Sequence, residues 1–555
     1  MAPPITEDAK TPRSLKLARR LLFPSLTDLF FMFIIILVFL VPVGGWQRLL
    51  ADGDTGLHIR VGDAIMAGRH VPTHDLFSFS RPGQEWFAFE WLSEVIFSFL
   101  HSLFGLKGVV LFSGVLLAAT FTALLRYALW LHANSLIALA LVLMAINTTF
   151  IHFLARPHLF TLLLTVVFMW LIAADRRRKS FRIWLLVPLM VLWTNLHGGF
   201  PVGFALLGLL VAGSALEAWL RGEIRPYRRL EAVRYAWVGF ACLSASLINP
   251  YGVKLHLHVL QVLRADWIRN LVDEFHSPTF RSEQMLLFMA LLFLGLIMVA
   301  PLVRKGKITD ALWILFLAYC SLVSVRHVPL FALVSVPIVA VEISAWWTAW
   351  ARTGTRQSLP AVIDDLAEQI RVYFGSVSLC PIILVTTICL TSSIQWPKDL
   401  FVENCPTNLI ARHAGQITSS RLLTSDQWAD YLVYHFYPRQ RVFIDGRHNF
   451  YGERIVTDYL KVIWGKPDWR EVLAKYGFDL VLCSSDWPLA SLLRSDPHWR
   501  MVDNDGKAIV FERSDRNSGE VASGAGRLQR CRAGNLCSAW SCWQLFVTPR
   551  LGGSC

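Results

Sequence analysis

Two aspartates separated by one residue, Asp52 and Asp54, are the carboxylates best placed to do chemistry in this sequence, and His58 and Arg60 follow them closely. A carboxylate can hold a divalent cation or take a proton from a hydroxyl, whereas Arg and His can bind phosphate. The common structural alternative is that the aspartates form an Asx turn or cap a helix. The pair alone therefore leaves both roles open.

Further polar groups stand at the ends of apolar runs. They are Arg156 and His158, Asn195 and His197, Asn249 and Tyr251, and Arg326 and His327. Each has an ordinary explanation, because Arg can extend from a span end to the interface and His-Gly-Gly or Asn-Pro can stop a helix. Ionisable groups near a membrane are costly and usually functional, so the collection of these groups at one depth favours a shared site.

The elements that carry these groups must be membrane helices. The chain is 54% hydrophobic and has a mean hydropathy of +0.46 over its 555 residues, with 22 Trp and 36 Phe. Such a composition is too apolar for a water-soluble protein, and Trp favours membrane interfaces. The net charge of +13 is explained by cytoplasmic loops rich in Lys and Arg, so we expect no nucleic-acid partner.

A membrane-spanning helix needs about 20 mainly apolar residues. Eleven runs meet or nearly meet that length, centred on 26–45, 108–130, 134–154, 157–174, 182–198, 200–220, 233–249, 284–303, 309–325, 329–350 and 376–394. The sequence thus predicts a polytopic α-helical membrane protein with about 11 spans.

Basic loops set the predicted direction of these spans. Arg176–Lys179, the 221–229 stretch, 304–307 and 352–371 all fall inside if the N-terminus is inside, provided that 86–106 does not cross. The loop 46–107 and the C-terminus then lie outside, and we expect surface-lying helices near 57–68 and 86–104. Every polar cluster named above falls on this outer side.

The predicted domains follow from that topology. A basic cytoplasmic N-terminus covers 1–25, and with the apolar run from Leu29 to Val43 that follows it, it is expected to form a retained signal anchor. The membrane domain covers 26–395, an outer α/β domain covers 396–514, and 515–555 forms a disordered tail. In the outer domain the patterns predict strands at 421–424, 441–444, 480–482 and 508–511, with a helix at 469–476.

These features resemble the GT-C superfamily of integral-membrane glycosyltransferases, which use polyprenyl-phosphate-linked sugars. The resemblance rests on Asp52-Gly53-Asp54 after the first span, on surface helices in the same outer loop, and on an α/β domain after the last span. The blocks 54–60, 193–199 and 443–447 look like bacterial GT-C-like membrane proteins of unassigned substrate.

The resemblance implies a fold, a reaction and roles for some residues. It implies a GT-C-like membrane enzyme that transfers a sugar, with inversion, from a polyprenyl-phosphate donor to a glycan, lipid or protein acceptor. The site would face the periplasm or exterior of a bacterial inner membrane. By analogy, Asp54 or Asp52 is the base or a ligand of Mg²⁺ or Mn²⁺. An arginine is the alternative group for neutralising the phosphate.

The remaining site residues come from their placement. We expect His58, Arg60, Arg156, His158, Asn195, His197, Asn249, Tyr251, Arg326 and His327 to bind the substrate. In the outer domain Asp445 and Arg447, with Asp426, Trp428 and Tyr451, are expected either to bind the acceptor or to support a turn. Two other functions remain open, a transporter or flippase for a polar or lipid-linked solute and a non-catalytic scaffold for envelope assembly.

Overall fold

A computed structural model describes residues 21–514, apart from 41–44, 221–225, 356, 375–377, 392–393 and 403–404. The predicted tail 515–555 and most of the basic N-terminus lie outside the described residues. The predicted domain boundaries at 25/26, 395/396 and 514/515 stay predictions.

Among the described residues, six helices are long and apolar enough to cross a membrane. They are α6 (Leu106–Trp130), α7 with η1 (Ser135–His152), α8 (His158–Arg177), α10 (Pro201–Leu220), α14 (Glu283–Arg304) and η4 with α16 (Val325–Ala351). Together they make this a multi-pass membrane protein. Their packed faces carry small and apolar residues; Gly213 of α10, for example, lies against Thr309 so closely that a β-carbon would not fit.

Shorter helices complete the bundle. The apolar ones are α2 (Leu26–Phe39), α5 (Trp91–Phe104), η2 with α9 (Phe181–Leu196), α15 (Ile308–Val323) and α18 (Cys380–Leu390), and α11 is Pro226–Ala245. Each of the eleven predicted apolar runs overlaps a helix. The number of crossings and their direction stay predictions.

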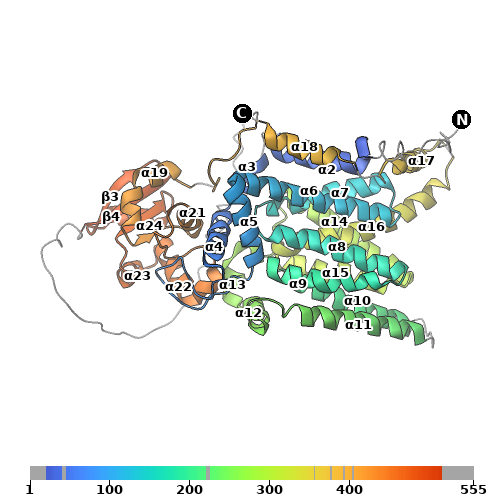
Figure 1. The fold of residues 1–555 in the computed structure, drawn as a ribbon, viewed down its shortest axis with the longest axis horizontal. Coiled ribbons are helices and arrows are strands. Elements are labelled where there is room, and N and C mark those ends of the chain that lie inside the picture. Colours follow the sequence, from blue (N-terminus) through green and yellow to red (C-terminus); the bar gives the residue numbers. More distant parts are fainter. Residues whose placement is uncertain are drawn as a thin grey trace. The chain divides into compact units, whose positions relative to one another are not determined.

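Two helices of the first loop run across one end of the long helices, α4 (Asp54–Gly68) and α5 (Figure 1). This is the course of surface-lying helices. Gly105, between α5 and α6, has a φ of 62°, a conformation that L side chains rarely adopt, and it lets the chain turn from α5 into α6. The short connecting elements at this end are α3 (Gly45–Leu49), α12 (Val253–Arg264), α13 (Asp266–Leu271) and η3 (Asp273–Phe275).

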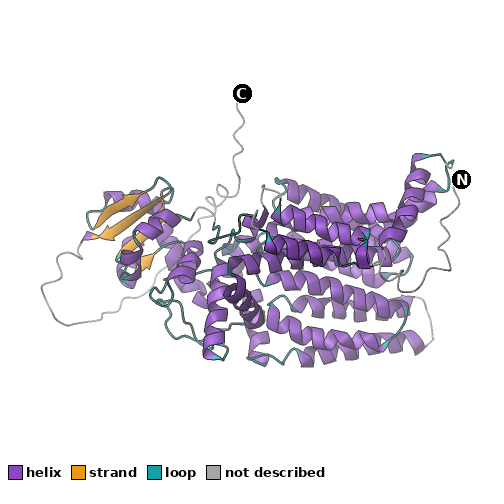
Figure 2. Cartoon of the chain, turned by 45° about the horizontal axis from the view of Figure 1, so that its top comes forward, coloured by secondary structure: helices purple, strands orange, loops and turns teal. Residues whose placement is uncertain are grey.

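The C-terminal domain contains a four-stranded sheet. Figure 2 shows its strands together with the helices of the domain. Its helices are α19 (Thr407–Arg412), α20 (Ala414–Thr418), α21 (Asp426–Phe436), α22 (His448–Ile463), α23 (Trp469–Tyr476) and α24 (Pro488–Ser495). Its strands are β1 (Leu422–Leu423), β2 (Leu480–Ser484), β3 (Trp499–Asn504) and β4 (Ala508–Arg513). Helix α17 (Leu359–Arg371) lies at the end of the membrane helices away from the C-terminal domain (Figure 1). Along the chain, α17 is followed by η5 (Val372–Phe374) and then by α18.

The strands lie in the order β1-β2-β4-β3, with β1 parallel to β2 and the other pairs antiparallel. Leu482 pairs with Val510 at the centre, where both strands are buried runs of apolar residues. The predicted strands around 422, 480 and 508 and the helix 469–476 are confirmed, whereas β3 was not predicted.

The predicted strand at 441–444 is wrong, because Val442 makes an isolated bridge to Ser78 of the first outer loop and the segment forms no strand. Val442 does not join the sheet; its N–H donates to the carbonyl of Phe77 at 2.9 Å, and its carbonyl accepts the N–H of Phe79 at 2.9 Å. The segment is apolar and extended, as its sequence suggests, but the first outer loop satisfies its backbone. This pairing ties the loop to the C-terminal domain.

Candidate active site

The two predicted aspartates lie at the start of α4. The Asp52 Oδ1 atom accepts the backbone N–H of Asp54 at 3.0 Å, which is the Asx turn that the pattern allowed. Both side chains are about nine-tenths buried, and the Oδ2 atom of each contacts Arg156. The pair therefore forms a turn and also belongs to a charged site.

Arg156 joins three carboxylates. Its Nη1 lies 2.8 Å from Asp52 Oδ2 and 3.4 Å from Glu274 Oε1, and its Nη2 lies 2.5 Å from Asp54 Oδ2. Burial opposes the charge of Arg156, but these carboxylates raise its pKa well above its usual value, so the guanidinium stays protonated. Arg326, whose Nε lies 3.9 Å from Glu274, adds a second cation to the cluster.

One oxygen of Asp54 has no hydrogen-bond partner among the described residues. This atom, Oδ1, is buried and faces Gly446, where a β-carbon would overlap it. A buried acceptor without a donor costs free energy, and such a cost is commonly carried at functional sites. Such an oxygen can accept a proton from a bound acceptor or from the neighbouring Asp430 carboxyl.

Asp430 of α21 lies against the same glycine. It is fully buried, and the N–H of Gly446 donates to its two oxygens at 3.3 and 3.2 Å. Burial, together with the charges of Asp54 and Asp445, raises the pKa of Asp430 well above its usual value. The C-terminal domain thus places next to Asp54 a carboxyl group whose protonated form is favoured, and a hydrogen bond to Asp54 adds to this preference.

His448 at the start of α22 pairs with Asp426 of α21, Nε2 to Oδ2, at 2.9 Å. Burial opposes protonation, but the hydrogen bond and charge of Asp426 raise the pKa of His448. Because the folded-state pKa is raised, the stabilisation is full below about pH 6.5 and is lost as the pH rises through the folded-state pKa.

We expect the melting temperature to fall more steeply from pH 6 to 9 in the wild type than in His448→Gln. The exposed His70→Gln control should follow the wild type, and identical curves for His448→Gln would contradict this ion pair.

A second cluster joins α4, α5 and the end of α9. His58 Nδ1 lies 3.2 Å from Glu94, its Nε2 lies 3.7 Å from Glu90, and His197 Nε2 lies 3.4 Å from the other oxygen of Glu90. The N–H of Gly199 donates to His197 Nδ1, so the proton of this imidazole sits on Nε2 and faces Glu90.

Other predicted site residues bond to the protein itself. Asn195 Oδ1 accepts the indole N–H of Trp91 at 2.8 Å, and Asn249 Oδ1 accepts the N–H of Tyr251 at 2.8 Å within a turn. The Tyr251 hydroxyl donates to the carbonyl of Pro72 at 2.9 Å, which anchors the outer loop. These contacts favour the structural alternative for Asn195, Asn249 and Tyr251.

Three more of these residues bond to backbone carbonyls. Arg60 Nε donates to Tyr434 at 2.6 Å, His158 Nε2 lies 2.7 Å from the carbonyl of His152, and His327 Nδ1 lies 3.2 Å from that of Cys320. Arg60 thereby joins α4 to α21. A substrate role for these three residues stays a prediction.

Asp445 and Arg447 form a buried network. Arg447 donates to Asp445 from Nε at 2.9 Å and from Nη2 at 2.6 Å, and Nη2 also lies 2.8 Å from Asp75 of the outer loop. The Tyr451 hydroxyl donates to Asp445 at 2.8 Å. With Asp445 fully buried, this geometry favours the turn-supporting alternative over acceptor binding.

Sequence reasoning missed two carboxylates of the central cluster, Glu274 and Asp430. Glu274 sits in a short polar connection, where nothing in its spacing relates it to Arg156. Asp430 had a usable signal, because Asp426 and Asp430 are four residues apart and so share one face of a helix.

The described part of the chain contains no group of three or more His, Cys, Asp and Glu side chains arranged to hold a metal ion. Asp52 and Asp54 are both paired with Arg156, so a divalent cation would have to displace this guanidinium. As they stand, these residues do not fit a metal. The predicted Mg²⁺ or Mn²⁺ site stays a prediction.

The arrangement of the helices and the C-terminal domain matches known structures. The Archaeoglobus fulgidus oligosaccharyltransferase in its apo form aligns with a TM-score of 0.51 at 13% identity, over 82% of this chain and 69% of that one. The same archaeal enzyme, AglB, in complex with an inhibitory peptide and a dolichol-phosphate aligns with a TM-score of 0.53 at 12% identity, over 87% and 73%. This chain has the GT-C fold.

A third structure of that archaeal enzyme, tethered to an acceptor peptide containing the NVT sequon, gives a TM-score of 0.52 at 12% identity over 82% and 68% of the chains. No protein-family model matches the sequence, and no curated protein matches it. The GT-C resemblance predicted from the outer loop and the C-terminal domain is confirmed at the level of the fold.

Proposed function

We propose that this chain is a membrane glycosyltransferase that moves a sugar from a polyprenyl-phosphate donor to an acceptor hydroxyl or amide. The observation that carries the proposal is Asp54, a buried carboxylate with one oxygen paired with Arg156 and the other facing Gly446 and Asp430, at the helix ends of a GT-C fold. A base and a fixed cation are the two groups that such a displacement needs.

In the proposed reaction the acceptor attacks the anomeric carbon directly. Asp54 takes the acceptor proton, the bond to the lipid phosphate breaks, and the phosphate leaves with the bonding electrons. A single displacement inverts the anomeric configuration. Arg156 and Arg326 neutralise the charge that develops on the leaving phosphate, for which the planar guanidinium is well suited.

The dolichol-phosphate in the AglB complex supports a lipid-phosphate donor, and the tethered acceptor peptide supports a protein as one class of acceptor, beside glycan and lipid.

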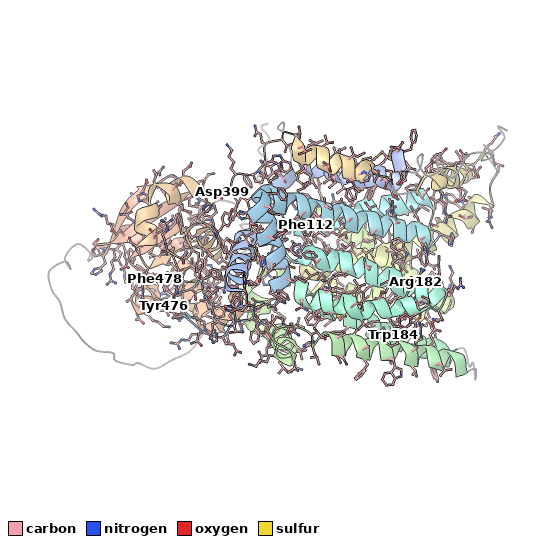
Figure 3. All side chains as sticks on the ribbon, in the orientation of Figure 1. Phe112, Arg182, Trp184, Asp399, Tyr476 and Phe478 are labelled. Carbon is pink, nitrogen blue, oxygen red and sulfur yellow. The ribbon has the colours of Figure 1, made fainter. Side chains whose placement is uncertain are left out.

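We place the site on the periplasmic side of a bacterial inner membrane. Figure 3 supports this direction, because Arg182, in a basic connection, lies at the end of the helices away from Tyr476 and Phe478.

The test is transfer of a labelled sugar from synthetic polyprenyl-phosphate donors by the full chain in lipid nanodiscs, with the anomeric configuration of the product determined. We expect an inverted product. A second assay follows the donor across the membrane of sealed vesicles that contain the protein, and translocation without any transfer would establish a flippase. A product with retained anomeric configuration would exclude direct displacement.

Metal dependence is predicted separately. Since Arg156 already supplies positive charge at both aspartates, we expect transfer in EDTA to stay within about twofold of the rate with Mg²⁺ or Mn²⁺. The measurement is a titration of each cation into EDTA-treated protein. Activity that vanishes in EDTA and returns with Mn²⁺ would support the cation alternative, with Arg156 displaced.

A further inference from the structure

A cavity of about 550 Å³ lies between the first outer loop and the C-terminal domain. The loop contributes Arg81, helix α22 contributes Tyr451, Glu453 and Arg454, and helix α23 contributes Lys475 and Tyr476. Its volume is that of a small-molecule site, and none of the carboxylates around Arg156 lines it.

Two arginines give the cavity its charge. Arg81 Nη1 donates to the backbone carbonyls of Phe450 and Tyr451, and the guanidinium lies 5.2 Å from the centre of the Phe450 ring. In the described ranges, neither Arg81 nor Arg454 pairs with a carboxylate. Lys475 is already neutralised by Asp458, and Glu453 contributes a negative charge at the exposed rim. The guanidiniums of Arg81 and Arg454, which have no carboxylate partner among the described residues, can therefore bind an anion.

Tyr476 gives the cavity aromatic surface, because its side chain is partly exposed, whereas Tyr451 is only 2% exposed. The hydroxyl of Tyr476 donates to Asp458 at 2.8 Å. With this hydroxyl engaged, the ring offers a mainly apolar face, which suits the C–H face of a sugar ring. Gly452, at a φ of 75° between Tyr451 and Glu453, leaves space where a side chain would approach Arg81.

The cavity is connected to the proposed active site through one short segment. Tyr451 holds Asp445, and the next residue, Gly446, packs against Asp54. The backbone that lines the cavity at Tyr451 is therefore only a few residues from the glycine that contacts the base.

We propose that this cavity binds an anionic sugar unit of a glycan acceptor, carrying a carboxylate or a phosphate, and so holds the acceptor beyond the unit that is modified. The proposal names the acceptor class and rests on the proposed transfer function. Two arginines without carboxylate partners among the described residues, beside the ring of Tyr476, select an acidic sugar over a neutral one.

The experiment measures binding without transfer. Full chain in nanodiscs is titrated with an oligoglucuronate, with an oligoglucose bearing a phosphate, and with a neutral oligoglucose of the same length. We expect at least one acidic oligosaccharide to bind more tightly than the neutral one, and the tighter of the two identifies the anion. Arg454→Gln should weaken acidic binding about tenfold and leave neutral binding unchanged.

The matched control is Arg439→Gln, an exposed arginine of the same domain outside the cavity, which should bind like the wild type. Equal affinity for acidic and neutral oligosaccharides, or unchanged acidic binding in Arg454→Gln, would overturn the proposal. Selective binding by a chain that transfers no sugar would defeat the transfer function and leave this site standing, so the two failures are distinguishable.

Discussion

Replacing Asp54 with Asn is expected to reduce sugar transfer by about 10²- to 10⁴-fold, the usual contribution of a general base. The amide is close in size to the carboxylate but cannot take the acceptor proton. It also gives up the charged contact of Asp54 Oδ2 with Arg156, while Arg156 keeps Asp52 and Glu274. The measurement is the single-turnover rate with a bound polyprenyl-phosphate donor.

Asp486→Asn is the matched control, since Asp486 is an exposed aspartate of the C-terminal domain. It should keep the wild-type rate. If Asp54→Asn transfers at the wild-type rate while remaining folded, Asp54 is not the base.

Replacing Arg156 with Lys is expected to lower the transfer rate by about 10²- to 10³-fold, as for the loss of a donor that stabilises a developing negative charge. Lysine keeps the charge but cannot hold Asp52, Asp54 and Glu274 with one rigid fork. The fall should appear in kcat, because the charge on the phosphate is greatest as the bond to the sugar breaks.

Arg156→Leu should be harsher, since it leaves buried carboxylates without a counterion, which costs on the order of 3 to 5 kcal/mol when a buried pair is broken. Arg182→Lys, at the far end of the helices, is the control and should be silent (Figure 3). A wild-type kcat in Arg156→Lys would show that this guanidinium does not act on the leaving group.

The membrane part of the fold could be predicted because hydropathy alone determines it. The run 108–130, for example, appears as Leu106–Trp130, and the helix predicted near 57–68 is present as Asp54–Gly68. A bilayer satisfies no backbone hydrogen bonds, so long apolar runs must be helical whatever their neighbours. A short apolar segment in water lacks such a constraint, so 441–444 has the pattern of a strand but is an extended segment whose Val442 bonds to Phe77 and Phe79.

The site could be predicted in part. Asp52, Asp54 and Arg156 meet, although Arg156 is more than a hundred residues away, because span ends on one side of a membrane converge. Asn249 could not be separated from a turn residue, since its local Asn-Pro pattern suits either role. Asp430 and Glu274 depend on how the C-terminal domain and the connection before α14 dock, and local sequence does not encode that docking.

The most direct measurement of the central claim is a structure of the full chain with a polyprenyl-phosphate bound. The account predicts phosphate density within hydrogen-bonding reach of Arg156 or Arg326, on the side of Arg156 where Asp54 lies. Phosphate bound away from both arginines, with Arg156 still paired to Asp52 and Asp54, would contradict it.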